Sequence, residues 1–273
     1  MVGPLGSGSE ATAERRASVI TAAQITKRAH ADGVDAKTVE RDYVLAHIVS
    51  LISRKDTGKM MVFKGGTSLR LLHFDDYRYS ADLDYSVTTT TCEQAHEFVR
   101  GALAGEELES IKNLQLIDKD DTKRVSYIGP LGAERSVKLD IADDELVEHT
   151  ELGRLRERWP DVPDVPVLVY TRLEVTAEKL RCILQRFQCR DLLDLSLLFE
   201  DGVDLVDAAA LFTRKATHRE LDPASFERVF EERMPRYKKA WERELEHYIS
   251  EAPHFDELER GVRRALRKTK LIR

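Results

Sequence analysis

The spacing of apolar residues divides the chain into helix-rich ends and a strand-rich middle. Near the start, residues 10–31 and 36–54 carry apolar side chains at helical spacing, with a polar break at 32–35 between them. The second segment has a broad apolar face. We therefore predict two N-terminal helices that pack on a sheet.

The middle of the chain consists of short apolar or alternating runs, which are typical of strands. The run 60–63 ends at a Gly pair and is followed by helical spacing over 67–72, which predicts a strand, a tight turn and a helix. Further strands are expected at 82–87, 114–118, 124–128, 137–141 and 167–170.

Two stretches between these strands are expected to behave differently. A helix reaching about Ala104 should begin with a capping box, formed either by Thr90 with Glu93 or by Thr91 with Gln94. The Pro-rich stretch 160–166 is expected to be an exposed connector.

From residue 174 onward the spacing is helical almost throughout. An apolar stripe of Leu173, Ala177, Leu180, Leu184 and Phe187 indicates a buried helix face. Three further helices are expected between 204 and 273.

These elements predict an α/β fold, α+β in the stricter sense, with a mixed sheet, flanking helices and a mostly helical C-terminal half. We expect a core over residues 10–170 and a helical region over 171–273. Residues 1–9 are rich in Gly and Ser and resemble the remnant of a cleaved expression tag.

Composition narrows the class of protein. With 42% apolar and 34% charged residues, the chain is typical of a globular protein with a sizeable core. The net charge of −6 excludes a general attraction to nucleic acid or to anionic membranes, so such binding must be local. No apolar run approaches the length of a membrane span and no signal peptide opens the chain, so we expect a cytoplasmic protein. The three cysteines and scattered histidines lack the spacing of a zinc site.

The Gly pair is a candidate anion site. Gly65 and Gly66 let a ligand approach the backbone closely, and the first amides of the following helix would point at it. The hydroxyls of Thr67 and Ser68 and the charge of Lys64 would add to that attraction. A Gly pair alone is equally often a plain turn, so the prediction depends on the next strand along the chain.

That strand carries a pair of acids. Asp82 and Asp84 should project from the same face, with Leu83 and Tyr85 on the other. Two adjacent carboxylates repel each other unless a cation lies between them, and hard oxygen ligands suit Mg²⁺. A single D-x-D pair is uninformative by itself, because the chain also holds Asp118-x-Asp120, which we interpret as a polar turn. The conjunction of anion site and acid pair predicts an enzyme that uses a nucleoside triphosphate.

A third acid, Asp140, lies on the alternating strand 137–141. We expect it to face inward between Leu139 and Ile141, where a carboxylate costs free energy unless it is paired or bound to a cation.

The run Phe-Lys-Gly-Gly-Thr-Ser-Leu at 63–69, followed by Arg-Tyr-Ser-Ala-Asp-Leu-Asp-Tyr at 78–85, resembles the first motif of the polymerase-β-like nucleotidyltransferases. More narrowly, it is similar to the abortive-infection nucleotidyltransferase toxins of the AbiEii and MenT group. Thr67 replaces the usual Ser but keeps the hydroxyl, and the 14-residue spacer from Thr67 to Asp82 suits this group better than the wider superfamily.

The resemblance continues in the helical half. The runs 177–181 and 190–195 are similar to the third and fourth motifs of the toxin family, so the resemblance covers roughly residues 40–200. It implies that Lys179 contacts the triphosphate, with Arg186 on the same helix face, whereas ordinary basic residues there would be solvated. It also implies one essential Asp in the last motif. Asp191 could instead be a helix N-cap and Asp194 is embedded among leucines, so either can hold that role.

The resemblance implies a reaction and its partners. The expected activity is transfer of a nucleoside monophosphate, from a triphosphate that is a pyrimidine nucleotide in this group, to the 3′ end of tRNA, which blocks translation. Two Mg²⁺ ions on Asp82, Asp84 and Asp140 would serve it, and a cognate antitoxin would restrain it. Two alternatives stay open: transfer to a small molecule or protein hydroxyl, and a non-catalytic module that binds a nucleotide or RNA.

Two further features concern regulation and RNA. Ser80 lies two residues before Asp82, and a phosphate there would bring negative charge to the expected nucleotide site, as in toxins of this group that antitoxin kinases silence. A hydroxyl that simply bonds the turn is the alternative. The stretch 260–273 has seven Lys or Arg and no acid, which suits an RNA backbone or a frayed basic tail.

Overall fold

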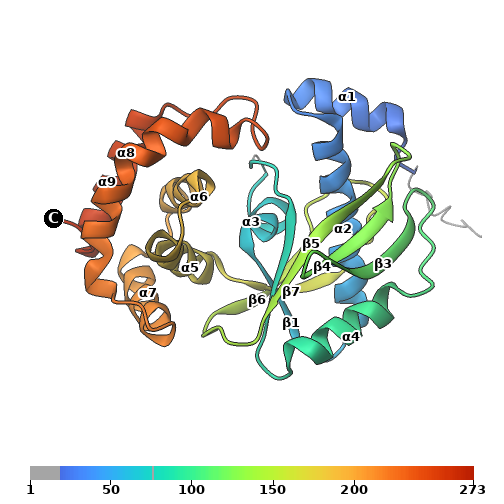
Figure 1. Ribbon diagram of the computed structural model, residues 1–273, viewed down its shortest axis with the longest axis horizontal. Coiled ribbons are helices and arrows are strands. Elements are labelled where there is room, and N and C mark those ends of the chain that lie inside the picture. Colours follow the sequence, from blue (N-terminus) through green and yellow to red (C-terminus); the bar gives the residue numbers. More distant parts are fainter. Residues whose placement is uncertain (1–18, 76) are drawn as a thin grey trace, which may run out of the picture.

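A seven-stranded mixed sheet forms the centre of the molecule in the computed structural model, which describes residues 19–75 and 77–273 (Figure 1). The strand order is β3-β4-β5-β2-β1-β7-β6. The strands are β1 (Met61–Lys64), β2 (Asp82–Val87), β3 (Lys112–Lys119), β4 (Thr122–Ile128), β5 (Glu134–Ala142), β6 (Thr150–Arg154) and β7 (Pro166–Tyr170). The predicted α/β class with a mixed sheet is confirmed, while the expected tag remnant at 1–9 lies outside the described residues.

The register of the central strands decides where the acids lie. β2 pairs antiparallel with β1 and parallel with β5, and it places Asp84 opposite Lys64 on one side and opposite Asp140 on the other. Directly paired residues project from the same face of a sheet. Lys64, Asp84 and Asp140 therefore form one row across three neighbouring strands.

Helices cover the two faces of the sheet differently (Figure 1). α2 (Ala36–Lys55) and α4 (Cys92–Leu103) lie on one face, and α1 (Ala22–Asp32) packs on α2. The α2 and α4 face holds a large apolar core that includes Leu83 and Tyr85 of β2. The alternation of β2 therefore turns its apolar side chains into the core and its acids to the opposite face, as predicted.

The C-terminal helices gather on the side of the acids. They are α5 (Arg172–Gln185), α6 (Cys189–Glu200), α7 (Leu205–His218), the 3₁₀ turn η2 (Pro223–Ser225), α8 (Phe226–Leu245) and α9 (Phe255–Thr269). They share a second apolar core built largely from their own side chains, and a smaller cluster around Tyr170, Val175 and Leu198 joins that half to the sheet. The division into residues 10–170 and 171–273 stays a prediction.

Several expectations about element boundaries need correction. The first helix was expected over 10–31, of which 10–18 lie outside the described residues. In the part that the structure describes, α1 begins at Ala22, because Thr21 and Gln24 form a capping box there. Of the two capping boxes considered for α4, the structure has the one formed by Thr91 with Gln94. Helix α5 ends at Gln185, since Arg186 has extended backbone, so Phe187 packs on the same core from beyond the helix.

The segment after β1 also differs from expectation. No separate turn intervenes: the short helix α3 (Gly65–Ser68) starts at the first glycine and passes directly into a π-helix, η1 (Leu69–His73). Within residues 19–75 and 77–273, none of the helices combines the length and the apolar character that a bilayer crossing requires.

Candidate active site

The junction of β1 and α3 brings backbone against the acid pair. Gly65 has a φ of 78°, and a Cβ there would clash with the carboxylate of Asp84. Only glycine allows both this left-handed conformation and this approach. Thr67 Oγ1 donates to the Asp82 carbonyl at 2.5 Å and Ser68 Oγ donates to the Gly65 carbonyl at 2.8 Å. Thr67 thus ties α3 to β2 and Ser68 bonds within α3, so both hydroxyls have partners in the protein, whereas they were predicted to point at a ligand.

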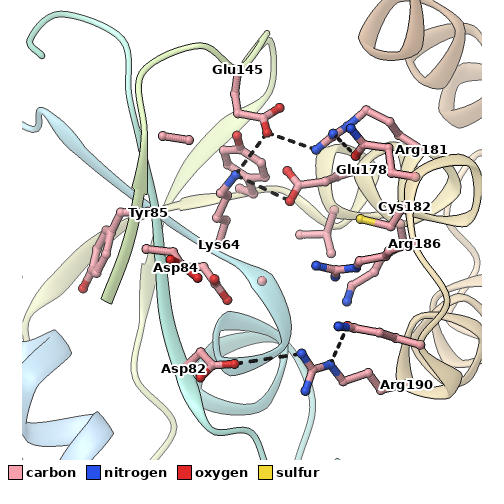
Figure 2. A pocket seen from close by; sticks show the side chains of 18 of the residues that line it. Lys64, Asp82, Asp84, Tyr85, Glu145, Glu178, Arg181, Cys182, Arg186 and Arg190 are labelled. Carbon is pink, nitrogen blue, oxygen red and sulfur yellow. Dashed lines mark hydrogen bonds and ion pairs between the residues drawn. The ribbon is translucent and has the colours of Figure 1, made fainter. Parts of the chain in front are cut away.

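Asp82 and Asp84 project from one face of β2 (Figure 2). The strand register places Asp140 of β5 beside Asp84. Burial, reinforced by the neighbouring charge of Asp82, raises the pKa of Asp84 to about 6, although Lys64 opposes the shift. Asp84 is thus a carboxylate held where its charge is poorly accommodated.

Asp140 was expected to be half enclosed by Leu139 and Ile141, and that expectation is wrong. Its side chain is 49% exposed and accepts from Lys138 Nζ at 2.6 Å. Strand alternation turns Leu139 into the core behind the sheet and leaves Asp140 on the open face.

These acids have the donor chemistry of a magnesium site. Three carboxylates share one face, and a cation would relieve the repulsion that disfavours the charge on Asp84. Among the described residues, however, no three His, Cys, Asp or Glu side chains are already gathered as a metal cluster. Asp82, Asp84 and Asp140 nevertheless fit a hard divalent cation, because all three are carboxylates and they project from the same face of the sheet.

Lys64 is surrounded by carboxylates that the sequence did not single out. Its side chain is 9% exposed, with Nζ 3.5 Å from Glu178 Oε1 and 3.8 Å from Glu145 Oε1 (Figure 2). Burial opposes the charge, but Glu178 and Glu145 outweigh it and raise the pKa of Lys64. Glu145 also accepts from Arg181 Nη2 at 3.0 Å. In the sequence, the one feature that could have pointed to Glu178 is its position directly before Lys179.

Lys179 is buried, so the alternative of a solvated helix face is wrong. Its Nζ lies 2.8 Å from Asp191 Oδ1 and 2.6 Å from Asp194 Oδ2. Burial disfavours the charge, but Asp191 and Asp194 outweigh it, so the pKa of Lys179 is raised. Arg186, just beyond the end of α5, donates to Asp191 from Nε at 2.8 Å. Lys179 and both acids therefore form one buried cluster.

Both acids of the last motif lie inside α6. Gln188 is the N-cap, so the alternative role of Asp191 as an N-cap is wrong. Asp194 has the partner it needs: Arg78 donates to both of its oxygens, at 2.7 and 2.8 Å, and Tyr77 Oη donates at 2.6 Å. In the sequence, Arg78 stands out only as part of the run that resembles the family motif. In the structure it ties the loop before β2 to the C-terminal half.

A cavity of about 460 Å³ lies between the open face of the sheet and the α5–α6 region. It brings together most of the predicted site residues, namely Lys64, Gly65, Ser80, Asp82, Asp84, Asp140, Lys179 and Arg186. The rest of its charged lining is Lys138, Glu145, Glu178, Arg181, Arg190 and Arg219. Figure 2 labels Glu145, Glu178, Arg181 and Arg190 among these. Gly66, Thr67, Ser68, Asp191 and Asp194 stand behind that lining.

Ser80 lines this cavity but does not belong to β2, which begins at Asp82. It is 9% exposed, so the expectation of a partly exposed hydroxyl is wrong.

The C-terminal basic stretch is not a frayed tail. Residues up to Thr269 continue α9, and Val262, Leu266 and Ile272 are buried in the C-terminal core. Arg263 pairs with Glu231 and Glu259, whereas Arg264 and Lys268 are exposed.

A mixed sheet that presents a D-x-D strand beside a Gly-Gly helix start defines a nucleotidyltransferase-like fold. Residues 48–266 match the family model described as nucleotidyl transferase AbiEii toxin, type IV toxin–antitoxin system. The chain therefore belongs to the AbiEii nucleotidyltransferase toxin family. Membership implies an enzyme with a nucleoside triphosphate substrate and a cognate antitoxin.

A solved structure supports this fold. MenT4, a nucleotidyltransferase toxin from Mycobacterium tuberculosis H37Rv, is 17% identical with a TM-score of 0.69, over 93% of this chain and 91% of that one. An antigenic nucleotidyltransferase-like protein from Paracoccidioides brasiliensis is 14% identical with a TM-score of 0.42, over 64% of this chain and 88% of that one, a likeness too low to define a fold. None of the curated proteins compared with the chain matches it in sequence.

Proposed function

We propose that this protein transfers a nucleoside monophosphate from a pyrimidine nucleoside triphosphate to the 3′ end of tRNA in the cytoplasm, and so blocks translation. The observation that carries the proposal is the row of Lys64, Asp84 and Asp140, with Asp82 beside it, facing Lys179 across one cavity. Carboxylates for a cation and buried ammonium groups for phosphates are the two needs of nucleotidyl transfer.

Asp82, Asp84 and Asp140 would hold two Mg²⁺ ions. When bound, Mg²⁺ neutralises charge on the leaving pyrophosphate and lowers the pKa of the attacking hydroxyl. The attacking hydroxyl gives up its proton to solvent and its oxygen forms a bond to the α-phosphorus. The bond from that phosphorus to the bridging oxygen breaks, and pyrophosphate leaves. The chain's part is to fix these groups in line, and the Gly65 contact with Asp84 serves that purpose.

The phosphate side of the reaction would rest on the backbone of Gly65 and Gly66 and on the charges of Lys64, Lys179 and Arg186. Both lysines keep their protons because buried carboxylates surround them. Asp194 lies at the centre of the polar cluster that places Lys179, and Asp191 joins Lys179 to Arg186, so both acids are candidates for the essential Asp of the last motif.

An RNA acceptor is supported by the exposed basic residues of the C-terminus. Arg260, Arg264, Arg267, Lys268 and Lys270 are exposed on and just after α9. Phosphate contacts of this kind supply affinity without sequence information.

The direct test is incubation with each labelled nucleoside triphosphate, Mg²⁺ and total RNA. We expect label from a pyrimidine nucleotide at the 3′ end of tRNA, and no label with Asp82→Ala or Asp84→Ala. Label on a protein or small molecule would favour the alternative acceptor class, and absence of transfer with bound nucleotide would favour a non-catalytic module.

Ser80 is a proposed regulatory site at the same cavity. Its position on the lining means that an added phosphate would face the acid pair. Ser80→Glu should lose transfer while Ser80→Ala keeps most of it, and equal activity in the two variants would remove Ser80 from the proposal.

A further inference from the structure

The cations that line the cavity differ in how firmly they are paired. Lys179 has two carboxylates within 2.8 Å, Lys138 has one at 2.6 Å, and Arg181 has one at 3.0 Å. Arg186 and Arg219 are likewise held by acids, and buried Lys64 lies between two of them. A cation that already has close acidic partners gains less from binding a phosphate.

Arg190, on the first turn of α6, is the exception among the described residues. Within residues 19–75 and 77–273, the one carboxylate within 4.0 Å of its guanidinium group is that of Asp82, with Nη2 3.9 Å from Oδ2. Its other contacts are neutral: Nε donates to Gln188 Oε1 at 3.0 Å and Nη1 donates to Tyr248 Oη at 3.0 Å. Figure 2 shows the guanidinium group reaching across the cavity toward Asp82. The side chain is 25% exposed, so a ligand in the cavity can reach it.

We propose that Arg190 is a further substrate-binding residue that exchanges Asp82 for the triphosphate when the substrate arrives. The inference rests on the proposed nucleotidyl transfer. In the free protein the guanidinium group offsets part of the repulsion between Asp82 and Asp84. Once a divalent cation binds those acids, its charge repels Arg190 from Asp82. Arg190 then lies beside the triphosphate, whose oxygens can accept hydrogen bonds from its planar guanidinium group.

This exchange predicts effects of opposite sign for two ligands. In the free protein Arg190 competes with a divalent cation for Asp82, so its removal strengthens cation binding. In the loaded protein it donates to phosphate oxygens, so its removal weakens phosphate binding. A residue that only stabilised the fold would weaken both or neither.

The experiment compares wild type with Arg190→Gln by equilibrium titration in the absence of acceptor. The first titrant is Mn²⁺ alone, followed by electron paramagnetic resonance of the free ion. The second is inorganic tripolyphosphate at saturating Mg²⁺, followed by calorimetry. We expect Arg190→Gln to bind Mn²⁺ roughly fivefold more tightly and tripolyphosphate at least about tenfold more weakly.

Two variants serve as controls. Arg214→Gln removes an exposed arginine that pairs with Glu148 outside the cavity, and both affinities should match wild type. Arg190→Lys keeps the positive charge but loses the paired N–H donors of the guanidinium group. Its Mn²⁺ affinity should stay near wild type, and its tripolyphosphate affinity should lie between those of wild type and Arg190→Gln. Thermal melts of each variant establish that the protein is folded.

The outcomes separate the two proposals. If wild type binds both ligands and Arg190→Gln binds them equally well, the assignment of Arg190 is wrong and nucleotidyl transfer stands. If both affinities fall together, Arg190 is a structural residue and the exchange is refuted. If wild type binds neither ligand, the proposed function itself fails and this inference fails with it.

Discussion

Asp84 is a half-buried carboxylate whose own surroundings oppose its charge. Its pKa is raised to about 6 by burial first and by Asp82 next. An acid with a raised folded pKa lowers stability once the pH exceeds that of the unfolded state, and the loss is complete above the folded pKa. At pH 7.5 the ionised group therefore destabilises the protein that has no cation bound.

Asp84→Asn should accordingly abolish transfer and still raise the stability of the metal-free protein. We expect a gain of about 1–2 kcal/mol in the free energy of unfolding at pH 7.5, and no gain at pH 3, where the wild-type acid is protonated. Urea unfolding with a chelator present measures both. Retained activity would refute the metal-binding role, and a loss of stability at pH 7.5 would refute the electrostatic interpretation.

His73 is the last residue of the π-helix η1, and its pKa is shifted in the opposite direction to that of Asp84. Its side chain is 6% exposed, and burial lowers its pKa to about 4, although a hydrogen bond with the Tyr170 carbonyl opposes the shift. Above about pH 6.5 the imidazole is neutral in both the folded and the unfolded state. Between that pH and about 4, only the unfolded state takes up a proton.

Stability should therefore fall by about 2–3 kcal/mol as the pH drops from 6.5 to 4 on account of this one residue. His73→Gln should flatten that part of the stability profile. His247→Gln, which removes an exposed histidine, is the matched control. If the two variants have identical profiles, folding does not lower the pKa of His73 and this interpretation is wrong.

At the scale of elements, α9 combines a structural face with a basic one. Truncation after Glu259 would remove Val262, Leu266 and Ile272 from the C-terminal core, so it cannot isolate the basic residues. Arg264→Glu with Lys268→Glu changes only exposed positions.

This double variant should weaken RNA binding and reduce the slope of log affinity against log salt, because fewer counterions are released. Nucleotide binding should be unchanged, since neither residue lines the cavity. Filter binding at several salt concentrations provides the slope. A slope equal to that of wild type would place the RNA surface elsewhere.

Elements with local signals were predictable from the sequence. The boundaries of β2 match expectation because alternation and turn residues lie within the segment itself, and the α4 cap is set by residues three apart. Lys64 with Glu178 and Arg78 with Asp194 join residues more than 100 positions apart, and no local pattern records such partners. The burial of Lys179 was missed for the same reason, since α6 supplies the acids that permit it.

At the scale of the whole molecule, the Arg78–Asp194 pair connects the loop before β2 with the C-terminal half. Both side chains are buried, at 2% and 0% exposure. Removing one member of a buried pair leaves the other charge uncompensated.

Arg78→Ala should therefore lower the free energy of unfolding by about 3–5 kcal/mol, as measured by urea unfolding. Arg214→Ala, which breaks an exposed pair, should cost less than about 1 kcal/mol. Combining Arg78→Ala with Asp194→Ala should cost less than the sum of the two single changes. Strict additivity would mean that the two side chains do not stabilise each other.

The dependence of Lys179 on α6 has a consequence for synthesis on the ribosome. The row of Lys64, Asp84 and Asp140 is complete once β5 has emerged, but the acids that accommodate Lys179 come only at 191 and 194. Domains fold as their segments become available during translation. A nascent chain that has exposed only the sheet thus lacks Lys179 and Arg186, the part of the proposed phosphate site that the helical half supplies. For a member of a toxin family, the order of the motifs along the chain itself delays activity until the sheet and the helical half are both made.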